Sequence, residues 1–330
     1  MKEQLLVDQY GRQLNYLRLS VTDRCNFRCY YCMPEEGINF ASRTELLSFD
    51  ELYTLSSLFC NLGVDKIRIT GGEPFIRVGI DDFLYRLSAI PALKEITVTT
   101  NGTLTYKQQQ VLKDTGVRKI NISLDSLNAE RFRQITRRDS FKKVYEGIFN
   151  LLADGFEIKL NCVVAEGKNI EDIIPFIELT KAHALAVRFL EEMPFNGSLV
   201  AGNSGWDHQQ IYNYIASAYA HINRLPAAPS STSVNYQVEG YRGSFGIIPS
   251  FSRTFCGACN RIRLSATGDL RTCLYGPPAA NLRDATRSGT SMDGLMEMIL
   301  DAVAKRKRDG FEAEEAGRMS IHTSMSVLGG

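Results

Sequence analysis

Residues 23–34, DRCNFRCYYCMP, place Cys25, Cys29 and Cys32 on one short loop with the spacing C-x3-C-x2-C. Three thiolates at this spacing can bind three irons of a four-iron, four-sulfur cluster, which ordinarily takes four cysteine ligands. One iron is then left open for chemistry, just as catalytic zinc sites keep one position free. A zinc loop, or a disulfide with one thiol left over, is the alternative, although no histidine that could complete a zinc site lies nearby in the sequence.

The composition is that of a globular protein with almost no net charge. The 330 residues are 44% hydrophobic, which suits one barrel-sized domain with an appendage or two modest domains. The formal charge of +1 argues against nucleic acid or a membrane surface as a partner, so local arginines must meet any anionic ligand. The first residues do not resemble a signal peptide, and no apolar run of about eighteen residues occurs. We therefore expect a soluble, cytoplasmic protein.

Six of the eight cysteines fall into two groups, and a reducing compartment favours metal binding over disulfides for them. The second group, Cys256, Cys259 and Cys273, has the spacing C-x2-C-x13-C and again offers three ligands. A zinc ribbon that lacks its fourth ligand is the alternative. Cys60 and Cys162 stand alone within apolar patterns and are expected to be core residues.

Short apolar strands alternate with longer helical patterns along most of the chain. This alternation predicts right-handed crossovers and a parallel sheet, and about six such units without an early G-x-G-x-x-G favour an α/β fold of partial (β/α)6-barrel type. The expected strands are residues 17–21, 66–70, 95–99, 119–124, 157–164 and 185–190, and the expected helices begin after Ser48 and near Thr105 and span 141–153 and 170–183.

Unusual polar and glycine residues follow these strands, at the carboxyl end where an α/β fold places its site. They are the first cysteine loop, Gly71-Gly72-Glu73-Pro74, Thr100-Asn101-Gly102, Asp125-Ser126 and Glu191-Glu192-Met193. Each could instead be an ordinary turn or helix cap. The Gly-Gly pair would let a ligand approach the backbone, and Glu73 would accept hydrogen bonds from an amine or hydroxyl pair.

Arg261 and Arg263 lie beside the second cysteine group and, by strand alternation, on one face. Paired arginines commonly form surface salt bridges, but beside an open cluster they would clamp phosphate through bidentate hydrogen bonds.

These blocks resemble the radical S-adenosylmethionine enzymes and, more closely, the molybdenum-cofactor protein A family, the GTP 3′,8-cyclases. The resemblance covers roughly residues 8–274 and the last few residues. It rests on DQYGRQLNYLRLSVTDRCNFRCYYCMP, IRITGGEPFIR, TTNG, NISLDSL, KLNCVV, RFLEEMPF and FCGACNRIRLSATGDLRTCL, which occur in the family's order.

The resemblance implies a lyase that uses two [4Fe-4S] clusters and S-adenosyl-L-methionine to take the hydrogen from ribose C3′ of GTP. The C3′ radical then attacks C8 of guanine and gives (8S)-3′,8-cyclo-7,8-dihydroguanosine 5′-triphosphate, in the first step of molybdenum cofactor biosynthesis. It further implies an external one-electron reductant, a downstream cyclic pyranopterin monophosphate synthase and a homodimer. A radical SAM barrel would span residues 1–225, and residues 226–330 would carry the second cluster, substrate contacts and the tail.

The resemblance also assigns residues. The cluster ligands are the six grouped cysteines, and the guanine base would bind the unique iron of the second cluster. S-adenosylmethionine contacts fall on Tyr31, Gly72, Ser123 and Met193, and GTP contacts on Arg18, Arg68, Thr99, Lys159, Arg261 and Arg263. The terminal Gly329 and Gly330 would reach into the active site and be needed for activity, although such an end could also be a frayed tail.

Alternation within their strands aims Arg18, Arg68 and Lys159 into the barrel, where an unpaired cation is costly. A bound anion would neutralise them, and an ion pair with Glu73 or Asp125 is the alternative. A second basic run, residues 305–308 (KRKR), is expected to be a solvated helix face near acidic residues 312–315.

Two other functions stay open at this point. A peptide-modifying radical enzyme with an auxiliary cluster would explain both cysteine groups, but not the NRIRL arginines or the Gly-Gly end. A non-catalytic iron–sulfur electron carrier would explain the cysteines, but it needs neither TGGEP nor an open iron.

Overall fold

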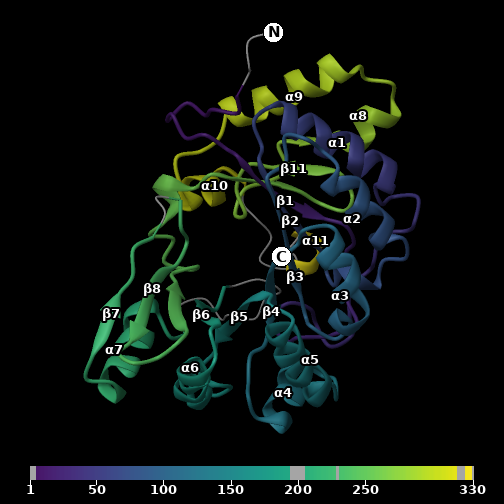
Figure 1. Cartoon of the computed structure of the whole chain (residues 1–330). Helices are drawn as coiled ribbons and strands as arrows, with labels where there is room; N and C mark the ends of the chain where they lie inside the picture. The colour runs from purple at the N-terminus through teal and green to yellow at the C-terminus, as the bar shows by residue number, and fades with distance from the viewer. Residues whose placement is uncertain (1–4, 194–204, 228–229, 318–323, 329–330) are drawn as a thin grey trace.

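A single curved sheet organises the chain (Figure 1). The computed structural model describes residues 5–193, 205–227, 230–317 and 324–328. The strands of these ranges are β1 (Tyr16–Ser20), β2 (Lys66–Thr70), β3 (Glu95–Thr100), β4 (Lys119–Ser123), β5 (Glu157–Val164), β6 (Ala186–Glu191), β7 (Ile222–Arg224), β8 (Val234–Val238), β9 (Ser244–Ile248), β10 (Arg261–Leu264), β11 (Asp269–Arg271) and β12 (Ala280–Asn281). They lie in the order β12-β11-β10-β1-β2-β3-β4-β5-β6-β9-β8-β7.

The six predicted strands are confirmed, each within one or two residues of its expected bounds. Strands β1 to β6 pair in parallel and in chain order, as a (β/α) barrel requires. The sequence did not predict that this sheet continues in parallel at both edges, through β10 beside β1 and β9 beside β6. Residues 226–330 therefore contribute strands to both edges of the same sheet, and the division of the chain at residue 225 stays a prediction.

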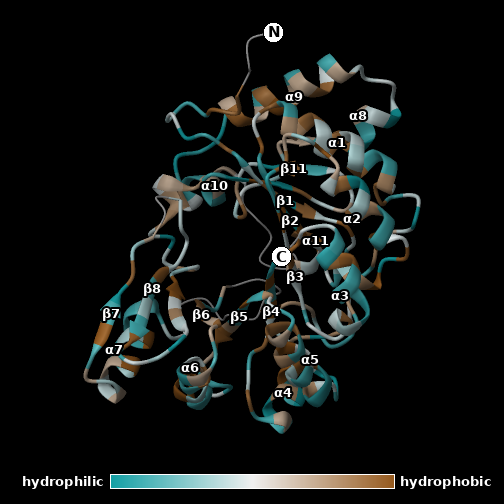
Figure 2. Ribbon diagram, in the orientation of Figure 1, coloured by the Kyte–Doolittle hydropathy of each residue, from teal (hydrophilic) through white to brown (hydrophobic). Residues whose placement is uncertain are grey.

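Helices cover the outer side of the curve, and Figure 2 shows that those such as α4 and α5 carry both hydrophobic and hydrophilic residues. The helices of the described ranges, including α11 on the inner side, are α1 (Phe49–Asn61), α2 (Ile80–Ser88), α3 (Thr105–Asp114), α4 (Ala129–Thr136), α5 (Phe141–Ala153), α6 (Ile173–Ala182), α7 (His208–Ala218), α8 (Leu282–Arg287), α9 (Met292–Ala304), α10 (Gly310–Gly317) and α11 (Met325–Leu328), with short 3-10 turns η1 (Pro74–Ile76), η2 (Ile170–Asp172) and η4 (Cys256–Ala258). The predicted capping box before α1 is present, because Ser48 and Glu51 each accept the other's backbone N–H.

Strand alternation separates the core from the inner face of the sheet. In β1, Leu17 and Leu19 are fully buried in the hydrophobic core that the strands share with the outer helices, whereas Arg18 points the other way and lines a cavity. Cys60 and Cys162 are buried in the core, as predicted.

Two expectations about helices differ from the structure. The helix expected over residues 170–183 begins as the 3-10 turn η2 before α6. The basic run at 305–308 does not form a solvated helix face, because it follows the end of α9 and the side chain of Arg306 is only 3% exposed. No helix in the described ranges is long and apolar enough to cross a membrane.

Candidate active site

A cavity of about 520 Å³ opens at the carboxyl ends of β1 to β6, on the inner side of the curve. It is lined by every predicted site residue that lies in the described ranges: Arg18, Cys25, Cys29, Tyr31, Cys32, Arg68, Gly72, Thr99, Ser123, Lys159, Met193, Cys256, Cys259, Arg261, Arg263 and Cys273. Gly329 and Gly330 lie outside the described residues. The structure therefore brings together side chains that are up to 255 positions apart in the sequence, from Arg18 to Cys273.

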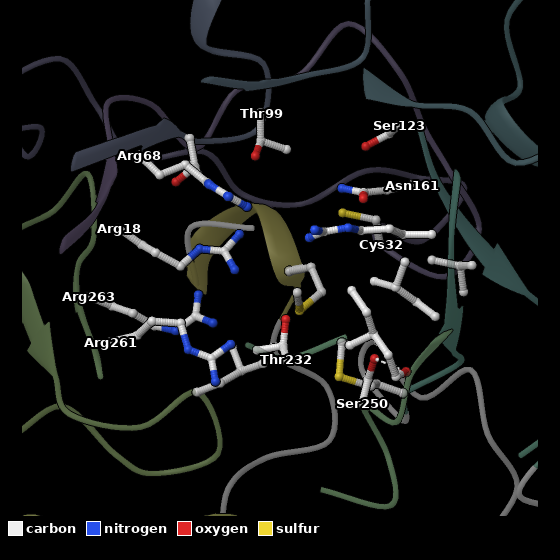
Figure 3. Close-up of a pocket in the computed structure, with 18 of the residues that line it drawn as sticks. Arg18, Cys32, Arg68, Thr99, Ser123, Asn161, Thr232, Ser250, Arg261 and Arg263 are labelled. Atoms are coloured by element: carbon white, nitrogen blue, oxygen red, sulfur yellow. Dashed lines mark hydrogen bonds between the residues drawn. The ribbon is translucent and has the colours of Figure 1, made fainter. Parts of the chain in front are cut away.

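Three arginines form a row across neighbouring strands of this cavity. Arg18 of β1 is in register with Arg263 of β10 on one side and with Arg68 of β2 on the other. Adjacent strands lie about 4.8 Å apart, so like charges that are directly opposite repel each other. Figure 3 shows these three side chains, with Arg261, gathered on one side of the cavity.

The ion pair with Glu73 or Asp125 that was the alternative for Arg18, Arg68 and Lys159 does not form. No ion pair joins Arg18, Arg68 or Lys159 to a carboxylate in the described ranges. Burial, followed by the charges of Arg263 and Arg68, lowers the pKa of Arg18 well below its ordinary value. Because arginine keeps its proton in proteins, this lowering expresses an electrostatic cost that a bound anion would relieve.

Several buried polar atoms on the cavity wall lack a hydrogen-bond partner in the described part of the chain. They are Nε of Arg18, Nε of Arg188, the hydroxyl oxygen of Thr99 and the hydroxyl oxygen of Tyr16. Buried polar groups are nearly always paired in folded proteins. This wall therefore offers unpaired polar atoms, two of them on arginines, to a ligand in the cavity.

Arg188 lines the cavity although it was not among the predicted site residues. It lies in β6 between buried Val187 and Phe189, and Figure 3 draws the neighbouring Asn161 on the same wall. Burial, then the charge of Arg68, lowers the pKa of Arg188 to about 10. The alternation that identified Lys159 in β5 also applies to AVRFLE and could have found Arg188.

The first cysteine loop packs directly against the Gly-Gly turn after β2. A Cβ atom at Gly72 would lie 2.2 Å from the backbone oxygen of Arg24, and one at Gly71 would lie 2.5 Å from that of Thr22. The Gly72 amide donates to the Thr22 carbonyl at 2.8 Å. The glycines thus admit the backbone of the cysteine loop, and because both also line the cavity, the approach of a ligand to them stays a prediction.

Glu73 and Asp125 bind their own chain. The fully buried Glu73 carboxylate accepts hydrogen bonds from the hydroxyl of Thr100 at 2.8 Å and the amide of Asn101 at 2.7 Å, and burial raises its pKa to about 7. Asp125 accepts from the Tyr31 hydroxyl at 2.8 Å and the Val163 amide at 2.9 Å. Glu73 therefore ties the Gly-Gly turn to the end of β3 and, contrary to our expectation, already has its donors within the chain.

All eight cysteines, each within the described ranges, have free thiols, which excludes the disulfide alternative in this structure. The described residues contain no group of three His, Cys, Asp or Glu side chains that could hold a single metal ion. This finding concerns single metal ions, because in a four-iron cluster each cysteine binds a different iron and the three need not converge on one point.

The second cysteine group lies on η4 and just after β11. The guanidinium of Arg261 donates from Nη2 and Nε to the sulfur of Cys259, at 3.1 and 3.3 Å. Burial alone would raise the pKa of the Cys259 thiol, but the charges of Arg261 and Arg306 outweigh it and lower the pKa to about 6. Cys259 is thus favoured as a thiolate, the form that binds metal.

The last described residues reach into the same cavity. The Ser324 hydroxyl donates to the Cys32 carbonyl at 2.6 Å, and Met325 and Ser326 line the wall. Leu328, only 1% exposed, packs with Tyr275 in a small apolar cluster that includes Met193 and Cys273. Helix α11 therefore connects the two cysteine groups, and it lies inside the curve of the strands in Figure 1.

Comparisons with known proteins decide the family. The Radical SAM superfamily model matches residues 19–180, and the Molybdenum Cofactor Synthesis C model matches residues 185–312. The GTP 3′,8-cyclase of Syntrophomonas wolfei is 40% identical over 300 residues, which are 90% of this chain and 92% of that protein. The chain belongs to the GTP 3′,8-cyclase family of radical SAM proteins.

Some members of this cyclase family are longer. Molybdenum cofactor biosynthesis protein 1 of Dictyostelium discoideum is 40% identical over 324 residues, which are 97% of this chain but 51% of that protein. The chain spans about half the length of the molybdenum cofactor biosynthesis proteins that it matches. Among solved structures, Streptococcus suis SuiB aligns with a TM-score of 0.62 and 13% identity, over 91% of this chain and 68% of that one. This likeness supports the radical SAM fold alone.

The contact between the Gly-Gly turn and the cysteine loop leads to a stability prediction for this cyclase-family chain. Gly72→Ala should lower the free energy of unfolding of the iron-free protein by about 1–3 kcal/mol, because backbone atoms must shift to admit the methyl group. Gly257→Ala is the matched control, since no atom lies within 4 Å of a Cβ there. Urea denaturation followed by circular dichroism measures both. Equal stability of the two variants would contradict the assigned contact.

Proposed function

We propose that this chain is a GTP 3′,8-cyclase, a lyase that converts GTP to (8S)-3′,8-cyclo-7,8-dihydroguanosine 5′-triphosphate, while one electron from an external reductant and one S-adenosyl-L-methionine yield methionine and 5′-deoxyadenosine. This reaction would be the first step of molybdenum cofactor biosynthesis. The observation that carries the proposal is the wall of Arg263, Arg18 and Arg68, which faces a cavity bordered by two three-cysteine groups. Membership of the cyclase family supports it.

The donor chemistry of the two cysteine groups fits iron–sulfur clusters. Free thiols are soft ligands of the kind that such clusters require, and three per group leave one iron open in each. Cys25, Cys29 and Cys32 would hold the first [4Fe-4S] cluster, and Cys256, Cys259 and Cys273 the second. Bound to the first cluster, S-adenosyl-L-methionine would supply the radical chemistry that the side chains of the protein lack.

The residues of the chain would bind and orient the two small molecules. Tyr31, Gly72, Ser123 and Met193 border the cavity and are the proposed S-adenosylmethionine contacts. The proposed GTP contacts are Arg18, Arg68, Thr99, Lys159, Arg261 and Arg263, to which we add Arg188 because its buried Nε lacks a partner among the described residues. A triphosphate carries about four negative charges, so it suits a wall of five arginines and one lysine.

These residues would contribute to catalysis mainly by holding the two small molecules in the right relative position. Guanidinium groups that hold the triphosphate would fix the ribose relative to the first cysteine loop, and a closed cavity would keep water away from a reactive intermediate. Gly329 and Gly330 follow Leu328, which packs beside Met193 and Cys273, and we propose that they complete the catalytic site from there. An external one-electron reductant, a downstream cyclic pyranopterin monophosphate synthase, a homodimer and a cytoplasmic location complete the proposal.

The release of 5′-deoxyadenosine distinguishes this function from the two alternatives, a peptide-modifying radical enzyme and a non-catalytic electron carrier. The anaerobically reconstituted, reduced protein should release 5′-deoxyadenosine rapidly only when GTP is present. Cys25→Ala should abolish this release, whereas Cys60→Ala, at a buried position away from the cavity, should retain it. Release that is fast without GTP would contradict a cyclase. No release at all from the loaded, reduced protein would favour an electron carrier.

A second prediction concerns the pH dependence of GTP binding. Burial, then the charges of Arg188 and Arg68, lowers the pKa of Lys159 to about 8. Lys159 is therefore charged below this pH and loses its charge as the pH rises through it, so GTP affinity should fall over this range. The fall should be about ten- to a hundredfold, the range for one hydrogen bond to a charged group.

Lys159→Arg is the matched variant, because its guanidinium stays charged throughout and should remove the fall. Anaerobic equilibrium dialysis between about pH 7 and 9.5 measures both proteins, so any titration of GTP itself is common to the two and cancels in the comparison. The same fall in the Lys159→Arg variant would assign it to another group.

A further inference from the structure

The basic run at residues 305–308 contains one side chain that solvent does not reach. The side chain of Lys305 is 75% exposed and that of Arg308 is 72% exposed, whereas that of Arg306 is 3% exposed. A buried arginine must be paired and hydrogen-bonded, since removing its charge from water is costly. The partners of Arg306 therefore reveal what the buried charge does.

Arg306 and a second arginine bind the backbone of the second cysteine group. Nη1 of Arg306 donates to the carbonyl oxygen of Cys259 at 2.7 Å, and Nη1 of Arg12 donates to the carbonyl oxygen of Cys256 at 3.1 Å. Arg12 is itself only 10% exposed and also donates to the carbonyls of Lys307 at 2.8 Å and Arg308 at 2.5 Å. Two cysteine peptides are thus held by charged donors that come from distant parts of the chain.

Asp8 holds both arginines in place. Its fully buried carboxylate accepts from Nε of Arg12 at 2.6 Å and lies 3.6 Å from Nη1 of Arg306. Asp8 and Arg12 belong to a tight turn that Gly11 makes possible with a φ of +75°. The flanking residues Leu6 and Leu14 are fully buried in the main core. The turn therefore has a fixed position relative to the sheet, and so do the two guanidinium groups.

In the brace, as we call Asp8, Arg12 and Arg306, the two arginines contact the backbone of the second cysteine group from outside the cavity. None of its three members lines the cavity, so they cannot touch a ligand there. Fixing the carbonyls of Cys256 and Cys259 fixes the peptide planes of η4 and hence the direction in which each Cβ leaves the backbone. Two arginines against one carboxylate also leave a surplus positive charge beside the second cysteine group.

We propose that Asp8, Arg12 and Arg306 are positioning residues that hold the second cysteine group in the geometry that binds its iron–sulfur cluster. The inference rests on the proposed function in one respect, namely that Cys256, Cys259 and Cys273 ligate a cluster. It adds an N-terminal turn and one residue of the basic run to the structure of that site. Groups behind metal ligands commonly change metal affinity by about ten- to a hundredfold when they are removed.

The test isolates the second site in the full-length chain. In a parent with Cys25→Ala, Cys29→Ala and Cys32→Ala, all cluster iron after anaerobic reconstitution belongs to the second site. Adding Arg306→Met should increase the rate of iron loss to a chelator by about ten- to a hundredfold. Arg306→Lys, which keeps one charged donor, should restore much of the retention. Lys305→Met is the matched control from the exposed part of the run and should behave like the parent.

A second parent protein, which keeps only the first cysteine group, distinguishes positioning of the second group from a general loss of structure. With Cys256→Ala, Cys259→Ala and Cys273→Ala as parent, Arg306→Met should leave iron retention at the first site unchanged. Equal losses from both sites, or unchanged retention at the second site, would overturn the positioning role. A first parent that binds no iron would instead contradict the proposed second cluster, so the two failures are distinguishable.

Discussion

A row of arginines on neighbouring strands concentrates positive charge in the cavity at the centre of this fold, and no described carboxylate forms an ion pair with Arg18 or Arg68. Arg263, Arg18 and Arg68 are held side by side by the hydrogen bonding of β10, β1 and β2, so they cannot move apart without breaking the sheet. Burial makes the repulsion more costly, as the lowered pKa of Arg18 indicates. A polyanionic ligand would turn this cost into binding energy. Local concentration of arginines would thus let a chain with a net charge of only +1 bind the proposed triphosphate.

The parallel sheet explains why so many distant residues meet at this cavity. Loops that follow parallel strands emerge at one edge, so the first cysteine group, the Gly-Gly turn and the turns after β3, β4 and β6 share it. The second cysteine group reaches the cavity because β10 adds to the sheet beside β1. A buried carboxylate lies behind each cysteine region. Glu73 ties the Gly-Gly turn, which packs against the first cysteine loop, to the end of β3, and Asp8 holds the Arg12 that binds the second cysteine group.

Local sequence patterns were sufficient for much of this arrangement. Alternation in β1, β2 and β5 predicted that Arg18, Arg68 and Lys159 face inward, and cysteine spacing identified both candidate ligand groups. The patterns failed where contacts between distant segments decide the outcome. Pairing of β10 with β1 joins residues about 245 positions apart, and nothing in either strand specifies its neighbour. The burial of Arg306 likewise depends on Asp8, so composition alone made a solvated run the natural interpretation.

The transfer of hydrogen from the substrate tests the central claim most directly, because it requires GTP on the arginine wall and S-adenosylmethionine on the first cysteine group at once. The loaded, reduced protein would be given GTP deuterated at ribose C3′ and, separately, GTP deuterated at guanine C8. Mass spectrometry of the released 5′-deoxyadenosine should find one deuterium from the C3′-labelled substrate and none from the C8-labelled one. Unlabelled 5′-deoxyadenosine from the C3′-labelled substrate would contradict the account.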